Sequence, residues 1–507
     1  MILLFSVAAI PWWAWLLIVL AIVFFRDVFV QRKHAIQHNF PLVGHIRYAL
    51  EKIGPELRQY IVANNREELP FNRSQRSWVY ASSKKQNNYH GFGTDQDIYQ
   101  HSYTFINNAL MPFKLPEGHI NWQKTDYLPC AKIMGPNRAK PFRPQSIVNI
   151  SAMSFGSLSS RAITSLNLGA KKAGAYHNTG EGGYSPYHQN GADVVFQIGT
   201  GYFGVRDENG QFSMQKLKQL IEKHPEIRAI ELKLSQGAKP GKGGVLPGKK
   251  ITKEIAAIRG VPVGIDVISP SYHTAFEGVQ GMVDFLEDMA TETGLPVGIK
   301  AAIGKTILWE KLAQIMAETG RGPDFITIDG GEGGTGAAPP SFANHVSLPF
   351  VYGFTKVYRI FVQKGITERI VFIGSAKLGF PSQAIQAFAM GADMVNVARE
   401  AMMAVGCIQA QSCHTNTCPA GVATQNKWLE AGINVKDKSE RVYNYLKTLR
   451  KEILEITHSS GYEHPCQYNM DDVHVSLGDK NMASTLRDTL GYEKCEVPFK
   501  GMASLVE

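Results

Sequence analysis

The chain has 507 residues, of which 44% are hydrophobic and 19% are charged, and its formal net charge is +9 with an isoelectric point near 9.0. This length predicts an ample core, and the sequence contains no Lys/Arg run with interleaved aromatic residues of the kind that a nucleic-acid groove needs. The mildly basic charge instead favours contact with anionic lipid or with acidic substrates. Three cysteines, Cys130, Cys466 and Cys495, are scattered, which is typical of a reducing compartment and not of a disulfide framework.

The first 25 residues carry no charged side chain and are mostly Leu, Ile, Val, Ala, Phe and Trp. As a helix they span roughly 37 Å, enough to cross a hydrocarbon core of about 30 Å even with Pro11 near the start. A cleaved signal peptide is the alternative, but no basic region precedes the apolar run and no small-residue cleavage site precedes Arg26. Basic residues follow the span, so the positive-inside rule predicts a single-pass cell-membrane protein with its body in the cytoplasm. Residues 1–33 are therefore the expected transmembrane anchor and its basic flank.

Residues 34–144 are polar and aromatic and carry no motif that we can name. Apolar side chains recur with helical spacing over residues 48–62 and predict a helix that packs on the larger domain. We expect 34–144 to be an α-rich collar between the anchor and the catalytic body.

From Ile147 onward, short apolar runs that end in Gly or polar residues alternate with helical stretches. Eight such runs predict an α/β fold, a parallel (β/α)8 barrel of the TIM type, at 145–425, with a helical extension and tail at 426–507. The expected strands are 147–154, 175–179, 229–234, 263–269, 297–301, 325–329, 370–375 and 394–398. A further apolar run at 194–198 is expected to be an insertion beside the second strand. In such barrels the chemistry lies at the C-terminal strand ends.

Half of the six cysteines, Cys407, Cys413 and Cys418, fall within twelve residues. Three soft sulfur ligands on a tight loop suit an iron-sulfur cluster. Zinc is the alternative, but structural zinc sites usually have four ligands and shorter spacings, and zinc would have to recruit His414 beside Cys413. Three cysteines favour three irons, although a non-cysteine fourth ligand would allow four.

The residues around these cysteines resemble the [3Fe-4S] loop of the synthase domain of glutamate synthases. Upstream motifs are similar to that domain in the same order, and the resemblance covers roughly residues 145–461. These motifs are Ser151-Ala-Met-Ser-Phe-Gly-Ser157, Asn178-Thr-Gly-Glu-Gly-Gly183, the lysine- and glycine-rich segment 233–250, and Gly333-Gly-Thr-Gly-Ala337. The chain is thus similar to a stand-alone, membrane-anchored form that lacks the glutaminase domain.

The resemblance implies FMN at the strand ends. Glycines after the seventh strand and the start of the helix after the eighth also match the place where barrels bind a phosphate. The alternative is that Gly374 merely permits a turn. Lys300 aligns with the family's lysine near flavin N1, where a cation stabilises the reduced flavin. The full set of expected cofactor residues is Ala152, Met153, Ser154, Gln197, Lys300, Glu332, Gly333, Gly334, Thr335, Gly374, Ser375, Asn396 and Arg399.

One further glycine motif bears on whether the chain binds a nicotinamide cofactor. Residues 199–204 spell G-x-G-x-x-G, but Asp207, Asn209 and Gly210 indicate a turn where a helix should open. We therefore predict no NAD(P)H domain in this chain, and electrons are expected from a partner such as ferredoxin or a membrane redox protein.

The substrate residues implied by the family are cationic or amide side chains: Lys233, Gln236, Lys239 and Arg259. Glu181 is the nearby acid, and Lys300, Glu181 and Lys239 are the candidate catalytic residues. Cations are what a dicarboxylate needs. The family sequence Gly-Glu-Gly-Gly-Gln is replaced here by Gly-Lys-Gly-Gly-Val at 241–245, and a family arginine is replaced by Tyr202. Loss of an amide partner can change specificity by orders of magnitude.

The leading hypothesis is an oxidoreductase of the EC 1.4 class that reduces an imine formed from a 2-oxo acid, such as 2-oxoglutarate, and ammonia or an amine. The alternatives are a flavin and iron-sulfur electron-transfer subunit without amination chemistry, an enzyme of the N-methylglutamate synthase type, and a structural barrel without cofactors. A homo-oligomer is compatible with each of them.

Overall fold

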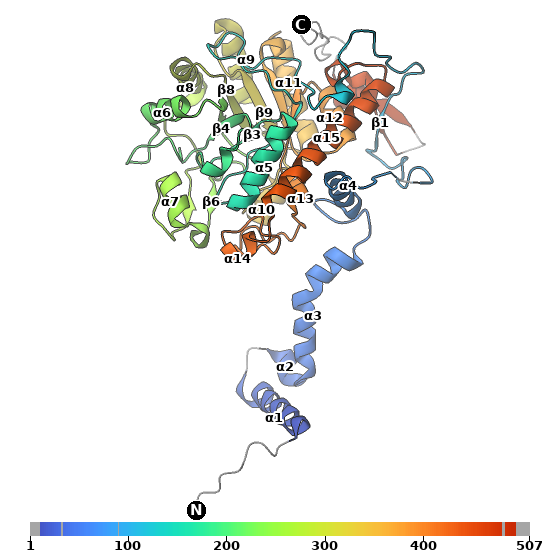
Figure 1. Cartoon of the computed structure of the whole chain (residues 1–507), viewed down its shortest axis with the longest axis vertical. Coiled ribbons are helices and arrows are strands. Elements are labelled where there is room, and N and C mark those ends of the chain that lie inside the picture. The colour runs from blue at the N-terminus through green and yellow to red at the C-terminus, as the bar shows by residue number, and fades with distance from the viewer. Residues whose placement is uncertain (1–10, 32–33, 90, 479–481, 493–507) are drawn as a thin grey trace, which may run out of the picture. The chain divides into compact units, whose positions relative to one another are not determined.

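A computed structural model describes residues 11–31, 34–89, 91–478 and 482–492 (Figure 1). The chain divides into two compact units, Met1–Ser77 and Trp78–Glu507. The larger unit contains the barrel and every residue predicted to bind cofactor or substrate. The boundary falls inside the 34–144 segment, and helix α4 (Arg73–Ser83) crosses it.

The first unit is helical. Its elements are α1 (Trp12–Phe25), η2 (Arg26–Val30), α2 (Ala35–Asn39), α3 (Val43–Leu57) and η3 (Arg58–Val62). Trp12–Val30 forms a 19-residue helical stretch with a mean hydropathy of 2.2, long and apolar enough to cross a membrane. The helix predicted over 48–62 is present as the second part of α3 and η3, but its apolar residues Leu50 and Ile53 are exposed.

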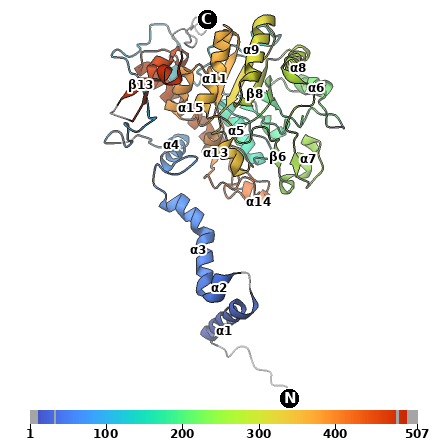
Figure 2. The same ribbon diagram turned by 180° about the vertical axis from the view of Figure 1, so that it is seen from behind.

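The second unit is built on a closed barrel of eight parallel strands, which confirms the predicted fold (Figures 1 and 2). The strands in spatial order are β2 (Val148–Ile150), β3 (His177–Asn178), β4 (Val194–Ile198), β5 (Ile227–Lys233), β8 (Val297–Ala302), β9 (Phe325–Asp329), β10 (Val371–Ser375) and β11 (Met394–Val397). All eight are largely buried, which explains their near-continuous apolar sequences.

Helices surround the barrel and follow most of its strands. They are α5 (Ser160–Ala173), α6 (Met214–Lys223), α7 (Lys253–Arg259), α8 (Gly278–Thr293), α9 (Ile307–Thr319), α10 (Pro340–His345), α11 (Phe350–Gln363), α12 (Pro381–Ala389) and α13 (Arg399–Val405). Several of them begin with a capping side chain, such as Ser159, which accepts a hydrogen bond from the Ala162 amide at the start of α5.

Two expected strands exchange roles. The run at 194–198 was predicted to be an insertion, but it is the third barrel strand β4. The run at 263–269 was predicted to be a barrel strand, but only Val267–Ile268 (β7) is extended, and it pairs antiparallel with β6 (Val245–Leu246) in the loop after β5. The error came from expecting a helix between successive strands, because β3 and β4 are joined by a loop with only a short 3-10 turn, η5 (Pro186–His188).

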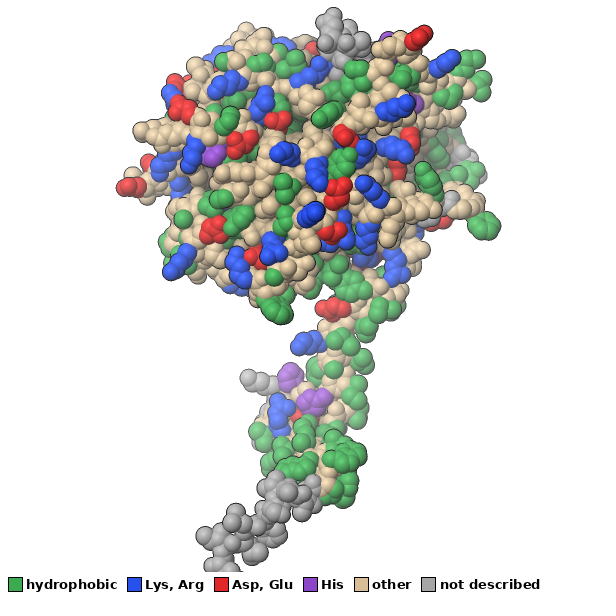
Figure 3. All heavy atoms as spheres, viewed as in Figure 1, with side chains coloured by type: hydrophobic (Ala, Val, Ile, Leu, Met, Phe, Trp, Pro, Cys, Tyr) green, Lys and Arg blue, Asp and Glu red, His purple; other side chains and the backbone are tan. Residues whose placement is uncertain are grey.

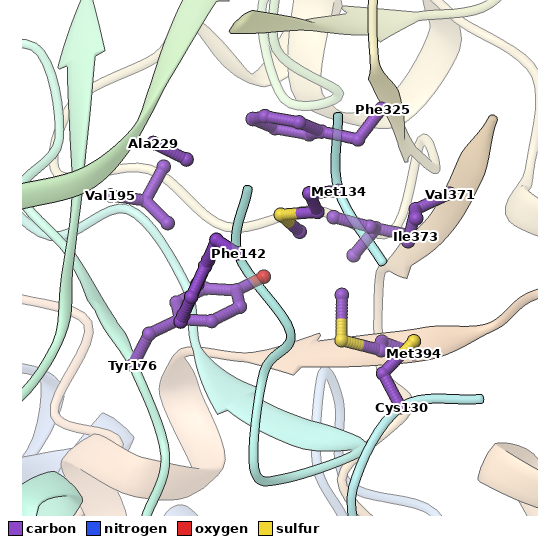
Figure 4. Close-up of a cluster of buried hydrophobic side chains, with 10 residues drawn as sticks. All are labelled: Cys130, Met134, Phe142, Tyr176, Val195, Ala229, Phe325, Val371, Ile373 and Met394. Carbon is purple, nitrogen blue, oxygen red and sulfur yellow. The ribbon is translucent and has the colours of Figure 1, made fainter. Parts of the chain in front are cut away.

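The segment before the barrel closes its N-terminal end. Cys130, Met134 and Phe142 pack against side chains at the first positions of the strands, including Phe325 of β9 and Met394 of β11 (Figure 4). Nearby, the buried Lys132 Nζ lies 3.2 Å from an Asp393 carboxylate oxygen. The last part of the predicted collar is therefore the plug of the barrel, and it leaves the opposite end for chemistry.

The C-terminal region packs outside the barrel. Its elements are α14 (Lys427–Glu430), the 25-residue helix α15 (Val435–Ser459) and α16 (Leu486–Leu490), with a three-stranded sheet of β1 (Thr104–Ile106), β12 (Val473–Ser476) and β13 (Ala483–Thr485). Helix α15 lies on α5, and a Cβ at Gly169 would come within 2.6 Å of two Val442 side-chain atoms. Gly169 therefore permits the close approach of these helices. On the face drawn in Figure 3, basic and acidic side chains of this unit are interspersed.

Candidate active site

The predicted residues gather at the C-terminal ends of the barrel strands. Gln197 lies in β4, Lys233 ends β5, Lys300 lies in β8 and Asn396 lies in β11. All four side chains are buried. Lys233 and Lys300 are register partners on neighbouring strands. Their ammonium groups therefore belong to the same end of the barrel, which is where barrels of this type carry their chemistry.

A buried carboxylate that the sequence analysis missed lies below this end. Glu231 of β5 is 1% exposed, and its Oε2 accepts hydrogen bonds from Asn178 Nδ2 at 2.8 Å and from Gln197 Nε2 at 2.6 Å. Its Oε1 accepts a hydrogen bond from Thr327 Oγ1 at 2.6 Å. Because the Glu231 oxygens accept these hydrogen bonds, the network turns the Gln197 amide nitrogen toward Glu231 and leaves the Gln197 carbonyl oxygen for another donor. The only signal in the sequence was a single acid inside an apolar strand.

Lys300 has a counter-ion, which the sequence analysis also missed. Its Nζ lies 3.6 Å from Asp329 Oδ1, and both side chains are buried. Asp329 ends β9, and its other oxygen accepts a hydrogen bond from the Gly237 amide at 2.8 Å. Burial of an unpaired ammonium is costly, and Asp329 supplies the partner that Lys300 needs at the strand ends.

The ends of the seventh and eighth strands bring two cations together. Arg399 begins α13 directly after β11, and Lys377 follows β10. Burial lowers the pKa of Lys377, and the charge of Arg399 lowers it further. Arg399 donates a hydrogen bond to the Glu332 carbonyl, and a Cβ at Gly334 would come within 2.7 Å of the Arg399 side chain. Two cations beside a glycine-rich backbone suit a phosphate group. Lys377 was not among the predicted residues.

Other predicted cofactor residues border this region. Gly374 and Ser375 end β10, and Tyr176 donates a hydrogen bond to Asn396 Oδ1 at 2.7 Å. Glu332 Oε2 accepts a hydrogen bond from the Phe350 amide at 2.8 Å, which fixes the loop that carries Gly333, Gly334 and Thr335.

Residues 152–154 follow β2, and the Met153 amide approaches the Asn178 carbonyl at 3.4 Å. The Met153 carbonyl lies 3.3 Å from the ring nitrogen Nε2 of His188. These contacts hold the backbone of the segment beside the barrel mouth.

A polar pocket lies at the C-terminal end of β5, where Lys233 is part of its lining. It is lined by Glu181, Thr200, Lys233, Leu234, Ser235, Gln236, Gly241, Lys242, Gly243, Gly244, Pro270 and Ser271. Lys233 Nζ donates to Glu181 Oε1 at 2.8 Å and to Gln236 Oε1 at 2.6 Å. Burial raises the pKa of Glu181, but Lys233, Lys239 and Arg259 outweigh this effect and lower it overall. Glu181 is therefore an ionised carboxylate near neutral pH.

Two predicted substrate residues do not line this pocket. Lys239 Nζ donates to the Ala337 carbonyl at 2.8 Å, and burial lowers the pKa of Lys239 to about 8. Arg259, at the end of α7, donates to the Phe155 carbonyl at 3.2 Å and to Ser154 Oγ at 3.4 Å, and it lies over the Phe203 ring. Burial lowers the pKa of Arg259 to about 10. The guanidinium thus ties the segment after β2 to the rim of the pocket.

Tyr202, which replaces a family arginine, has a structural role. Its hydroxyl accepts hydrogen bonds from the amides of Thr274 at 2.9 Å and Ala275 at 3.0 Å, and it lies 3.2 Å from His273 Nδ1. Thr200 Oγ1 donates to the Pro270 carbonyl at 2.6 Å. Together these contacts hold the 270–275 loop that forms one wall of the pocket.

The cysteine loop is fastened to the barrel by its backbone. Tyr80 donates to the Cys407 carbonyl at 2.8 Å, and the buried Lys250 donates to the Cys413 carbonyl at 3.0 Å. Burial raises the pKa of the Cys413 thiol, and the neighbouring Cys418 raises it further. Across the described ranges, no group of three or more His, Cys, Asp or Glu side chains is close enough together to hold a metal ion. The thiols are the right donors for a cluster, but in this structure they are not gathered into a ligand set.

Comparison with known proteins identifies the family. The family model described as the conserved region in glutamate synthase matches residues 118–463. The glutamate synthase large subunit-like protein YerD of Bacillus subtilis is 38% identical over 493 residues, which cover 90% of this chain and 93% of YerD. An archaeal-type glutamate synthase (NADPH) of Thermotoga neapolitana is 33% identical over 317 residues, and the match spans 62% of this chain and 59% of that protein.

Among solved structures, a flavocytochrome b2 variant aligns over 90% of this chain and 94% of its own at 10% identity, with a TM-score of 0.44 that is too low to argue from. The sequence relatives and the family model, which matches well over half of the chain, decide the assignment. The chain therefore belongs to the glutamate synthase family of oxidoreductases.

Proposed function

We propose that this protein reduces an imine formed from a 2-oxo acid and ammonia or an amine, with FMN as its cofactor. The observation that carries the proposal is the position of the pocket around Glu181, Lys233 and Gln236 beside buried Lys300 at the strand ends. A cation-rich pocket next to a fixed ammonium is what the reduction of an anionic substrate by a flavin requires.

The residues at the strand ends fit FMN. Lys377 and Arg399, with the backbone of Gly374 and Ser375, supply the charge and amides that a phosphate needs. Lys300 and the carbonyl oxygen of Gln197 would meet the flavin ring. The remaining proposed contacts are Ala152, Met153, Ser154, Glu332, Gly333, Gly334, Thr335 and Asn396. When bound, the flavin supplies the hydride.

The proposed substrate residues lie in the pocket, as Lys233 and Gln236 do, or outside its lining, as Lys239 and Arg259 do. The proposed ligands of the substrate carboxylate are Lys233, Gln236 and Lys239, and Arg259 adds positive charge near Glu181. Because Glu181 stays ionised, it attracts an ammonium or amine and keeps Lys233 in place; it accepts a proton more readily than it supplies one. This arrangement would bring an anionic 2-oxo acid and a cationic amine into the same pocket.

Electron entry is proposed through the cysteine loop. Cys407, Cys413 and Cys418 are the proposed ligands of a [3Fe-4S] cluster, which when bound passes single electrons. The donor set and the backbone contacts from Tyr80 and Lys250 support this proposal. Ferredoxin or a membrane redox protein would be the donor.

We further propose that the apolar helix anchors the protein to the cell membrane, with the body in the cytoplasm. The support is the apolar stretch Trp12–Val30, followed by Arg32 and Lys33, and the absence of side-chain positive charge before it. The proposed layout is an anchor at 1–33, a collar at 34–144, the barrel with its cysteine loop at 145–425 and a C-terminal extension at 426–507.

The test is anaerobic purification of the full chain in detergent, followed by measurement of flavin and iron and by electron paramagnetic resonance. Bound FMN, a three-iron signal that is absent in Cys413→Ser, and glutamate formation from 2-oxoglutarate, ammonia and a chemically reduced ferredoxin would support the proposal. Cofactors without amination would favour the electron-transfer role, and protein without flavin would refute the enzymatic proposal.

A further inference from the structure

The pocket carries more positive than negative charge. Lys233 is paired with Glu181, whereas Lys239 donates a hydrogen bond to the Ala337 carbonyl. Lys242 lines the pocket and is close enough to Lys239 to lower its pKa. Within the described part of the chain, the Lys242 ammonium has no carboxylate partner and contacts the Phe342 ring, 5.7 Å from its centroid. Lys242 therefore lines the pocket without a carboxylate partner, and Lys239 adds positive charge beside it.

The backbone fixes Lys242 at this position. A Cβ at Gly243 would come within 1.8 Å of the Ser269 carbonyl oxygen, and one at Gly244 would come within 2.6 Å of Glu181 Oε1. The two glycines therefore allow the loop to lie directly against the β7 segment and against Glu181. The Ser269 amide donates to the Gly244 carbonyl at 2.9 Å, which extends the pairing of β6 with β7. Lys242 thus stands on an ordered loop at the mouth of the pocket.

We propose that Lys242 is a specificity-determining residue, whose ammonium binds the second, distal carboxylate of a dicarboxylic 2-oxo acid. Val245, which stands where the family has a glutamine amide, does not line the pocket, whereas Lys242, which stands where the family has an acid, does. A charge at the mouth thus takes over the recognition that the amide supplied. The inference rests on the proposed function only for the assignment of this pocket to the 2-oxo acid.

The test measures binding and not turnover. Calorimetry on the purified full chain compares 2-oxoglutarate with 2-oxopentanoate, which has the same carbon chain without the distal carboxylate. The wild-type protein prefers the dicarboxylate, and the preference falls with added salt because the contact is partly exposed. Lys242→Gln reduces the preference by about threefold, as expected for a partly exposed ion pair, and Lys242→Glu reduces it further.

Lys249→Gln is the matched control, because Lys249 is an exposed lysine of the same segment outside the pocket lining. An equal preference in Lys242→Gln, Lys249→Gln and the wild-type protein overturns the inference, as does a wild-type protein that binds both acids alike. A preference that depends on Lys242 in a protein without amination activity would uphold the inference and refute the proposed reaction. Amination activity in a protein whose preference does not change in Lys242→Gln would uphold the proposed reaction and refute the inference.

Discussion

Replacement of the buried carboxylate Glu231 by an amide tests whether the barrel core prepares the flavin site. Glu231→Gln keeps the shape of the side chain but replaces one acceptor oxygen with a donor. Turned toward Asn178 and Gln197, the new NH2 group opposes two donors; turned toward Thr327, it forces that hydroxyl to change from donor to acceptor. Hydrogen bonds to a buried charged group contribute about 1.5–3 kcal/mol each, and an opposed buried donor costs about 1–3 kcal/mol. We expect a loss of about 2–4 kcal/mol in the free energy of unfolding.

The same substitution should release the orientation of Gln197, so that the purified variant retains less FMN per polypeptide than the wild-type protein. Thermal unfolding followed by circular dichroism, together with flavin quantification, measures both effects. Glu222→Gln on the exposed face of α6 is the control, and it should lie within about 0.5 kcal/mol of the wild-type protein. Wild-type stability in Glu231→Gln would refute the expectation that this network needs two acceptor oxygens at position 231.

Three further outcomes follow from the contacts described above. Lys132→Met leaves Asp393 buried without its cation and should lower the free energy of unfolding by about 3–5 kcal/mol. The double variant Lys132→Met/Asp393→Leu should recover much of this loss, and wild-type stability in the single variant would contradict the ion pair. Burial lowers the pKa of Lys239 to about 8, so the affinity for a 2-oxo acid should fall as the pH rises through about 8, because the ammonium loses its proton there. In Lys239→Arg that decline should disappear, and a flat wild-type profile in calorimetry would argue against Lys239 as a ligand. Lys250→Met should lower the iron content but not the FMN content, because it removes the hydrogen bond to the Cys413 carbonyl; equal losses of both would indicate general misfolding.

The barrel was predictable because its strands are buried on both sides and therefore appear as continuous apolar runs. The strand assignment failed where the local pattern is ambiguous. The run at 263–269 is apolar enough for a strand, yet only Val267 and Ile268 pair, and they pair with β6 in a two-stranded sheet outside the barrel. The lysines and glycines proposed for the site come from motifs. Glu231 and Lys377 were not predicted, because their significance depends on side chains that only the closed barrel brings near, such as Thr327 of β9 and Arg399 at the start of α13.

The segment after β5 connects the two halves of the proposed chemistry. It begins at Lys233, which is bonded to Glu181 in the pocket, and seventeen positions later Lys250 donates to the carbonyls of Ser157 and Cys413. Asn416 of the cysteine loop also donates to the Lys249 carbonyl at 3.1 Å. One loop thus forms a wall of the proposed substrate pocket and the seat of the cysteine loop. Because both are fixed by the same backbone, a change that displaces this loop should disturb the pocket and the seating of the cysteines together.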